Sequence, residues 1–547
     1  MSPIARSFVL ALVAASLLAS TAQARPSQSS MMMDDDPLLY RGAATAQRTM
    51  TQMKWLGADT IRVTVLWSVV ADKARFTRAQ IRKLKSQQAR AAARLQTKRF
   101  RGSRPKTYPL LNWDRYDDLV RIARAVGLRV FFNVTGPGPK WAHSKPPRSQ
   151  RKLSGTYKPK PSLYRQLVKA VGRRFSGSYR DENQSRSVLP RVSFWSLWNE
   201  PNQAGWLAPQ WDKVRGRRVL VSAMLYRKLY QHGYKGLTSS GHRLGTDKIL
   251  LGETAPLGSR RKTTKSPSYP AVFLRELSCL RSNGSTKYSG AAAEARGCNR
   301  FGPKLRASGY AHHPYTKNVP TTRRPPRNGL TMANISKLGA LLDKLSSKSG
   351  RKIPSRLPLW MTEFGYETNP PDPFNGVTLA QQALYSQLGE YLAFANRRIA
   401  SQTQFLLRDV LPVAKRKPGT KPYWFTYQSG LYFSNGVPKP AAYAYALPFL
   451  AFGGKTDPAT GRRSFRFWGQ LRFLPDGANA KAVIQGRPKG SAGGWTPIGS
   501  PIAVSPRGYF QATHVNPIAG AVEWRGAWLR PDGRIGAVSL PSTGTSR

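Results

Sequence analysis

Short apolar runs alternate with longer amphipathic stretches along most of this chain. Runs rich in branched and aromatic residues are typical of buried strands, and apolar residues spaced three and four apart indicate helices. We predict strands at residues 38–40, 60–67, 129–134, 192–198, 249–252, 307–312, 359–362 and 404–407. Helices are predicted at residues 43–56, 116–126, 163–175, 223–234, 335–345, 379–396 and 441–449.

Strands that alternate with helices in this way favour an α/β fold. Eight such units predict a closed (β/α)8 (TIM) barrel over residues 25–452. In such a barrel the residues that follow each strand face one shared site.

The pattern changes after Gly453 and Gly454. Short β-like stretches, separated by Gly, Pro and Asp, take over at residues 465–473, 480–485 and 521–529. They predict a small all-β, sandwich-like accessory domain over residues 453–547. Its tryptophans leave two roles open, carbohydrate binding or bracing of the barrel.

The first residues read as a signal peptide over residues 1–24. Arg6 gives the positive start, residues 8–18 the apolar stretch and residues 22–24 a small-residue cleavage site. No later apolar run is long enough to predict a transmembrane segment. We therefore expect a secreted protein, extracellular or on the cell surface.

Charge is very uneven, with 88 Lys and Arg residues against 26 Asp and Glu and a formal net charge of +62. Such a charge attracts polyanions, for example an acidic glycan or an anionic cell-wall polymer; the alternative is a bias that only keeps the protein soluble. No motif for specific nucleic-acid binding is present. Residues 73–106 contain no acidic residue and look like a basic insertion, partly helical at 78–95, that either is simply solvated or contacts a polyanion.

Cys279 and Cys298 are the two cysteines of the chain. In an oxidising compartment they can form one disulfide, and two free thiols are the alternative. No Cys/His cluster surrounds them, so neither a metal nor a cofactor is expected.

The strongest chemical signal is a pair of carboxylates at predicted strand ends. Glu200 lies in Trp-Asn-Glu-Pro-Asn, residues 198–202, at the end of the fourth strand, and Glu363 follows the seventh. Glycosidic cleavage with retention needs two carboxyls about 5–5.5 Å apart, one to protonate the leaving oxygen and one to attack the anomeric carbon. The positions of Glu200 and Glu363 are consistent with that chemistry.

These motifs resemble clan A of the retaining glycoside hydrolases. The form Trp-Asn-Glu-Pro-Asn is similar to family 39 (β-xylosidase-like) and family 5 (cellulase-like), and the resemblance spans roughly residues 38–452. It implies that Glu200 is the general acid/base and Glu363 the nucleophile. No metal or cofactor is implied, because two carboxylates suffice.

The resemblance also implies roles for neighbouring residues. Asn199 would bind the sugar 2-hydroxyl, and Arg62 would keep the nucleophile ionised. Tyr315 would donate to Glu363, while His313 would face the sugar. The sequence neighbour Trp198 would desolvate Glu200 and keep it protonated.

Further candidates are Glu253, after the fifth strand, and Trp424, after the eighth. Glu253 either binds substrate or pairs with a nearby arginine. Trp424 is the best candidate for a sugar-stacking platform, with Trp67, Trp141 and Trp198 as others. The tryptophan common at the end of strand eight in this clan is missing, so the resemblance does not extend to the sugar.

Together these features predict a secreted retaining glycosidase that cleaves a β-linked poly- or oligosaccharide. The alternative is a non-catalytic glycan- or polyanion-binding protein on the same barrel.

Overall fold

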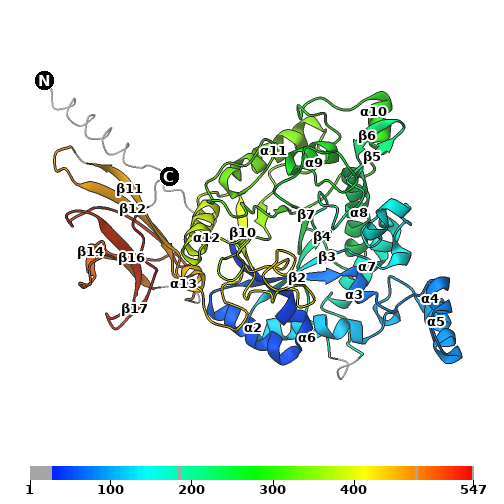
Figure 1. The fold of residues 1–547 in the computed structure, drawn as a ribbon, viewed down its shortest axis with the longest axis horizontal. Coiled ribbons are helices and arrows are strands. Elements are labelled where there is room, and N and C mark those ends of the chain that lie inside the picture. Colours follow the sequence, from blue (N-terminus) through cyan, green and yellow to red (C-terminus); the bar gives the residue numbers. More distant parts are fainter. Residues whose placement is uncertain (1–27, 183–186, 457, 475–478, 545–547) are drawn as a thin grey trace.

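The computed structural model describes residues 28–182, 187–456, 458–474 and 479–544, so the signal peptide predicted at residues 1–24 lies outside the described residues. Eight parallel strands form a closed barrel, surrounded by helices (Figure 1). Around the barrel the strands follow the order β1-β10-β9-β8-β7-β4-β3-β2. Their bounds are β1 (Ser29–Met33), β2 (Thr60–Leu66), β3 (Arg129–Thr135), β4 (Phe194–Leu197), β7 (Lys248–Thr254), β8 (Gly309–His312), β9 (Leu359–Met361) and β10 (Ile399–Phe405). The predicted TIM barrel is confirmed.

The first predicted strand is wrong. Residues 38–40 belong to a short π-helix, η1 (Asp36–Tyr40), whose second residue, Pro37, suits a helical first turn. The strand is β1, a methionine-rich run in a stretch that looked polar. It pairs with β10 and β2 and thereby closes the barrel.

The eighth strand also begins earlier than the predicted residues 404–407. Strand β10 alternates Ser, Thr and Gln in a buried setting, which hides it from a search for apolar runs. It ends at Phe405, a point that matters for the site below.

Helices cover the outside of the barrel. The larger ones are α2 (Ala43–Trp55), α6 (Leu111–Val126), α7 (Pro161–Arg174), α8 (Val221–Thr238), α9 (Pro270–Leu277), α11 (Ser336–Lys348), α12 (Leu379–Phe394) and α13 (Pro440–Ala446). Shorter elements are α3 (Trp67–Val70), α10 (Gly290–Ala295), η2 (Pro105–Thr107), η3 (Lys140–Ala142), η4 (Arg148–Leu153), η5 (Met332–Asn334) and the hairpin β5 (Trp211–Val214) and β6 (Arg217–Leu220).

Two hydrophobic clusters divide the barrel into an inside and an outside. On β2, Ile61, Val63 and Val65 join the large cluster between strands and helices. A smaller cluster fills the interior with residues from different strands: Met31, Phe131, Leu250, Ala311, Trp360 and Ala400. Arg62 pairs in register with the inward-facing Phe131, so it points into the barrel. The interior cluster forms a floor beneath the polar residues at the strand ends.

Beyond the barrel, two antiparallel sheets pack on each other. One holds β11 (Phe449–Thr456), β12 (Arg463–Gln470) and β15 (Tyr509–Val515); the other holds β14 (Thr496–Ala503), β13 (Lys481–Pro488), β16 (Val522–Leu529) and β17 (Ile535–Val538). Residues of both sheets share one core, as in a sandwich. The sheets contact the barrel through α12, where the buried Arg472 pairs with Glu390 at 2.8 Å and Trp468 packs on Phe394.

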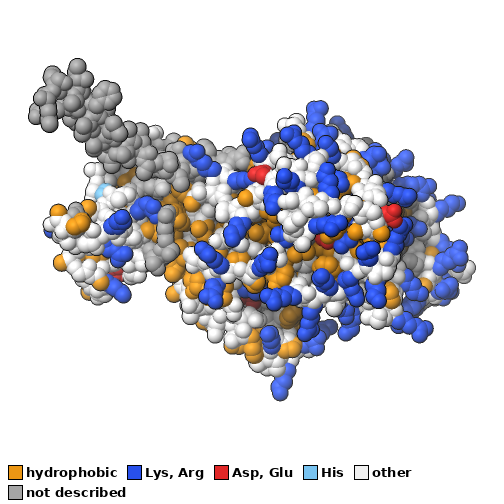
Figure 2. Space-filling view, turned by 90° about the horizontal axis from the view of Figure 1, so that it is seen from above, with side chains coloured by type: hydrophobic (Ala, Val, Ile, Leu, Met, Phe, Trp, Pro, Cys, Tyr) orange, Lys and Arg blue, Asp and Glu red, His pale blue; other side chains and the backbone are white. Residues whose placement is uncertain are grey.

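The basic insertion forms two helices, α4 (Arg78–Arg82) and α5 (Gln87–Arg99), rather than one. Thr77 and Ser86 cap their amino ends, so the second cap interrupts the predicted helix. Both helices lie at the edge of the barrel away from the C-terminal sheets (Figure 1). Lys and Arg side chains are spread over the molecular face seen in Figure 2, with few acidic ones.

Cys279 and Cys298 form a disulfide, which decides between the two alternatives left by the sequence. No helix in the described part of the chain is long and apolar enough to cross a bilayer.

Candidate active site

A cavity of about 720 Å³ opens at the carboxyl ends of the barrel strands. Glu200 and Glu363 both line it, with side chains 19% and 12% exposed. They are therefore reachable by a ligand but largely removed from water. One carboxylate oxygen of Glu200, one of Glu363 and a ring nitrogen of His313 all lie within 4.8 Å of one another.

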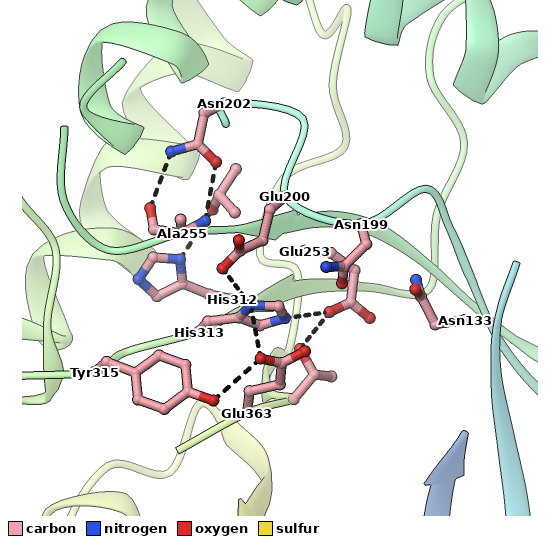
Figure 3. A network of polar contacts seen from close by, with 12 residues as sticks. Asn133, Asn199, Glu200, Asn202, Glu253, Ala255, His312, His313, Tyr315 and Glu363 are labelled. Carbon is pink, nitrogen blue, oxygen red and sulfur yellow. Dashed lines mark hydrogen bonds and ion pairs between the residues drawn. The ribbon is translucent and has the colours of Figure 1, made fainter. Parts of the chain in front are cut away.

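The backbone at the strand ends is held in an uncommon conformation. Trp198 and Glu200 have φ angles of 77° and 34°, and Glu253 has 54°. Residues other than glycine adopt such angles at a cost, and the surrounding structure must impose them. Three bonds hold the backbone here. Glu200 N–H donates to the Glu253 carbonyl at 2.8 Å, and the Asn202 side chain both donates to the Ala255 carbonyl and accepts from the Ala255 N–H (Figure 3). The loops after β4 and β7 are thus tied together.

Arg62 lies fully buried beneath the cavity and connects three site residues. Its Nη1 donates to Glu363 Oε1 at 3.0 Å, and its Nη2 donates to Glu253 Oε2 at 3.1 Å and to Asn199 Oδ1 at 3.0 Å. Burial disfavours its charge, but Glu253 and Glu363 outweigh burial and raise the pKa of the guanidinium. The contact between Arg62 and Glu363 that the sequence led us to expect is present.

Glu253 does not reach the cavity, since its side chain is 1% exposed. Its Oε2 accepts from Arg62, from His313 Nε2 at 2.6 Å and from Thr362 Oγ1 at 2.7 Å. Burial raises the pKa of this carboxyl, but Arg62 and His313 lower it by more, so that the pKa falls to about 2. Of the two roles left open by the sequence, the structure places Glu253 as the partner of an arginine.

His313 is buried and bridges the carboxylates (Figure 3). Nδ1 lies 3.0 Å from Glu200 and 3.4 Å from Glu363, while Nε2 contacts Glu253. Burial lowers the pKa of the imidazole, but the carboxylates of Glu363, Glu200 and Glu253 raise it to about 10. A doubly protonated ring donates through both nitrogens. His313 therefore faces carboxylates, and it is not among the residues that line the cavity.

Glu363 is surrounded by donors, as the sequence led us to expect. Tyr315 Oη donates to it at 3.1 Å, beside Arg62 and His313. Burial nevertheless outweighs His313 and Arg62, and the carboxylates of Glu200 and Glu253 add to it, so the pKa of Glu363 is raised.

The two cavity carboxylates differ in the donors that reach them. Glu363 receives bonds from Arg62 and Tyr315 as well as His313, whereas Glu200 receives only that from His313 among the described contacts. These donors favour the charged form of Glu363 and oppose the effect of its burial.

Asn199 is oriented by its neighbours. Its Oδ1 accepts from Arg62, and its backbone N–H donates to Thr135 Oγ1 at 2.9 Å. Because the oxygen is engaged by a cation, the amide nitrogen is left to donate into the cavity that Asn199 lines.

None of the four predicted aromatic platforms is among the described residues that line the cavity. Trp141 packs edge-on against Trp67 and Phe100. Trp67 and Trp198 are fully buried in the core, where both rings pack against Tyr164, so neither can stack on a sugar or desolvate Glu200 from the cavity side. Trp424 contacts Tyr423 and is not among the residues lining the cavity.

Other aromatic residues, not singled out from the sequence, line the cavity instead. They are Trp206, Phe405 and Tyr427. Phe405 ends β10 and packs edge-on against Tyr315 and Tyr427. With the eighth strand placed at its true bounds, an aromatic residue does end it, and correct placement of β10 would have shown this.

Charged residues at the cavity also went unnoticed in the sequence. Asp35 follows β1 and accepts from the Thr64 backbone at 3.1 Å. Glu367 lies further out, where burial and then the carboxylates of Asp372 and Asp409 raise its pKa to about 7 against the opposing charge of Lys317. Lys317 is the one cation among the lining residues described.

Glu200, His313 and Glu363 lie close enough together to surround a metal ion. Their chemistry does not suit one. Both His313 nitrogens donate to carboxylates and its raised pKa keeps the ring protonated, so it has no lone pair for a metal.

No protein-family model matches the sequence, and no curated protein is recognisably similar to it. Solved structures with a similar course of the chain include a GH39 β-xylosidase from Caulobacter crescentus (14% identity, 86% of this chain and 84% of that chain, TM-score 0.42). A second is the GH39 enzyme from Xanthomonas axonopodis pv. citri, with 14% identity over 91% of this chain and 94% of that chain and a TM-score of 0.44. A third is a family 1 β-glucosidase from Thermotoga maritima, with 10% identity over 78% of this chain and 98% of that chain and a TM-score of 0.43. At these values the likeness is one of fold, and the function must be argued from the site.

Proposed function

We propose that this protein is a secreted retaining glycoside hydrolase that cleaves a β-linked poly- or oligosaccharide. The observation that carries the proposal is the close approach of the two carboxylates, with oxygens within 4.8 Å at the mouth of one cavity. Retaining enzymes hold their two carboxyls about 5–5.5 Å apart, whereas inverting enzymes separate them by about 6.5–9.5 Å to admit a water.

In the first step Glu363 attacks the anomeric carbon while Glu200 gives its proton to the leaving oxygen. The glycosidic bond breaks, and an ester forms between the sugar and Glu363. Glu200, now ionised, then takes a proton from water, whose oxygen attacks the same carbon and releases Glu363. The second step thus returns a proton to Glu200, which is then ready for another cycle.

The surrounding residues position the two reacting carboxyls. Arg62 and Tyr315 hold the attacking carboxylate of Glu363 in position. His313 holds both reacting carboxyls through one nitrogen and is itself held by Glu253 through the other. The Asn199 amide would bind the sugar 2-hydroxyl, a bond that strengthens in the transition state.

The cavity lining gives some guidance on the sugar. Asp35, Glu363 and Glu367 face it, opposed by Lys317. A carboxylate-bearing sugar would be repelled at the point of cleavage, so we propose that the cleaved residue is neutral. An acidic polymer would then be recognised elsewhere on the protein.

The test is trapping with 2-fluoro glycosides of several neutral sugars, followed by mass mapping of peptides. The fluorine slows the second step, so a covalent sugar should accumulate on the peptide that carries Glu363. An adduct on another peptide would overturn the assignment, and the sugar that reacts names the substrate.

The alternative is a non-catalytic glycan- or polyanion-binding protein. The buried Arg62–Glu253–His313 network weighs against it, because a binding surface has no need for a costly buried charge cluster beneath two reactive carboxyls. Binding of neutral oligosaccharides without turnover of any of them would favour the alternative.

A further inference from the structure

A second depression lies on the outside of the barrel, away from the cavity. This groove has a volume of about 670 Å³ and is lined by residues of four segments. Arg191 precedes β4, and Ser239 follows α8 on the way to β7, so the groove lies near the amino ends of these strands. Glu200 and Glu253 lie at their carboxyl ends. The groove and the cavity are therefore on opposite sides of the barrel.

Its lining is basic. Arg104, Lys106, Arg173 and Arg191 contribute positive charge, and no carboxylate is among the lining residues that the structure describes. Arg191 is neutralised by the buried Asp247 at 2.8 Å. The carboxylate of Glu182, which accepts from Tyr179 of the lining, is paired with the buried Arg174.

Three cations thus remain without an ion pair in the described part of the chain: Arg104, Lys106 and Arg173. Bonds define the position of the Arg173 side chain and of the backbone turn that carries the other two. Arg173 Nη1 donates to the Ser103 carbonyl at 3.1 Å, and the turn that carries Arg104 is closed by bonds from Thr107 to the carbonyls of residues 101 and 104. The guanidinium of Arg173 therefore loses little freedom on binding an anion.

We propose that this groove binds the phosphate or sulfate groups of a polyanionic polymer. A concave surface focuses the field of its charges, and guanidinium groups match the oxygens of tetrahedral oxyanions. The groove also continues into the basic insertion, since Arg104 and Lys106 follow α5 directly and Lys98, Arg99 and Arg101 are exposed beside them. A chain with charged groups at regular intervals can occupy the groove and extend along α5.

This site does not depend on the proposed glycosidase activity. It assigns the binding of polyanions to one place on the protein, rather than to a general attraction by its positive surface. The critical comparison is therefore between this groove and the same number of charges elsewhere.

The test uses two triple variants of the full-length protein. The first is R104Q/K106Q/R173Q. The matched control is R462Q/K489Q/R534Q, which removes two arginines and one lysine that are exposed in the C-terminal sheets. Binding of linear polyphosphate and of dextran sulfate is measured by titration over a series of salt concentrations.

We expect the groove variant to bind about tenfold to a hundredfold more weakly and its slope of log K against log salt to be smaller by about two. The control should change affinity by less than about twofold. Tighter binding of polyphosphate or of dextran sulfate identifies the preferred group. Equal weakening in both triple variants, or no binding by the unaltered protein, would overturn the proposal.

A second variant tests whether weaker binding results from misfolding. The double variant R104Q/K106Q leaves the Arg173–Ser103 bond intact, and within the described residues neither of the two replaced side chains forms a hydrogen bond or ion pair. It should unfold at the temperature of the unaltered protein and still bind several-fold more weakly. Normal affinity in this variant would contradict the proposal.

Discussion

The floor of the cavity and the basic insertion hold charge in opposite ways. Beneath the cavity, Arg62, Glu253 and His313 are fully buried and joined by bonds of 3.1 Å or less. In residues 73–106, Lys and Arg recur without any acidic residue, and none of them has an ion pair in the described part of the chain. Water and salt screen the second group, whereas only partner charges stabilise the first. Net charge therefore describes the surface of this protein and says little about its site.

The largest effect should come from the reacting carboxylates. Glu363→Ala should lower kcat by about 10⁴-fold or more, because the covalent step loses its nucleophile. Glu200→Ala should lose activity mainly on glycosides with poor leaving groups, which need a proton. Hydrolysis assays with a series of aryl glycosides measure both.

Glu294→Ala serves as the control for these variants. This glutamate is exposed and pairs with Arg215 at the surface. Its loss should leave hydrolysis unchanged. Undiminished hydrolysis in Glu363→Ala would refute the mechanism.

The next effect compares two arginines directly. Arg62→Met leaves two buried carboxylates without their cation and should cost about 3–5 kcal/mol of unfolding free energy. Arg94→Met, on exposed α5, should change it by no more than about 0.5 kcal/mol. Denaturant unfolding of both variants measures the difference. Similar values for the two would break the contrast between the regions.

A further effect concerns pH. The pKa of His313 is raised to about 10 in the folded protein from an ordinary value of 6.5. Its charge therefore stabilises the fold fully below pH 6.5, and this contribution is lost as the pH rises through about 10. The stability gap between the unaltered protein and His313→Gln should narrow over that window in unfolding experiments.

The same variant should affect catalysis. Without the imidazolium, the already raised pKa of Glu363 should rise further, so the acidic limb of kcat/KM should move up by about 1–3 pH units. An unchanged acidic limb would show that His313 does not act on Glu363.

The pattern of apolar residues predicted the strands correctly where the strands consist of branched and aromatic residues. The strand ends that hold Glu200 and Glu363 stand out because apolar runs precede them. Pattern failed at β1 and β10, where methionine or buried polar residues replace the usual branched ones. The error at β10 also placed the end of the strand at residue 407 instead of at Phe405, so the phenylalanine that stands where the clan has a tryptophan was overlooked.

The sequence by itself determined the barrel and the two carboxylates, because strand order places successive strand ends around one rim. Only the tertiary structure decided which charged residues surround these carboxylates. The roles of Arg62, Glu253 and His313 depend on distances between residues of different strands and on their complete burial. Electrostatic interactions in a buried site change steeply with both quantities, and neither is encoded in any local stretch of the chain.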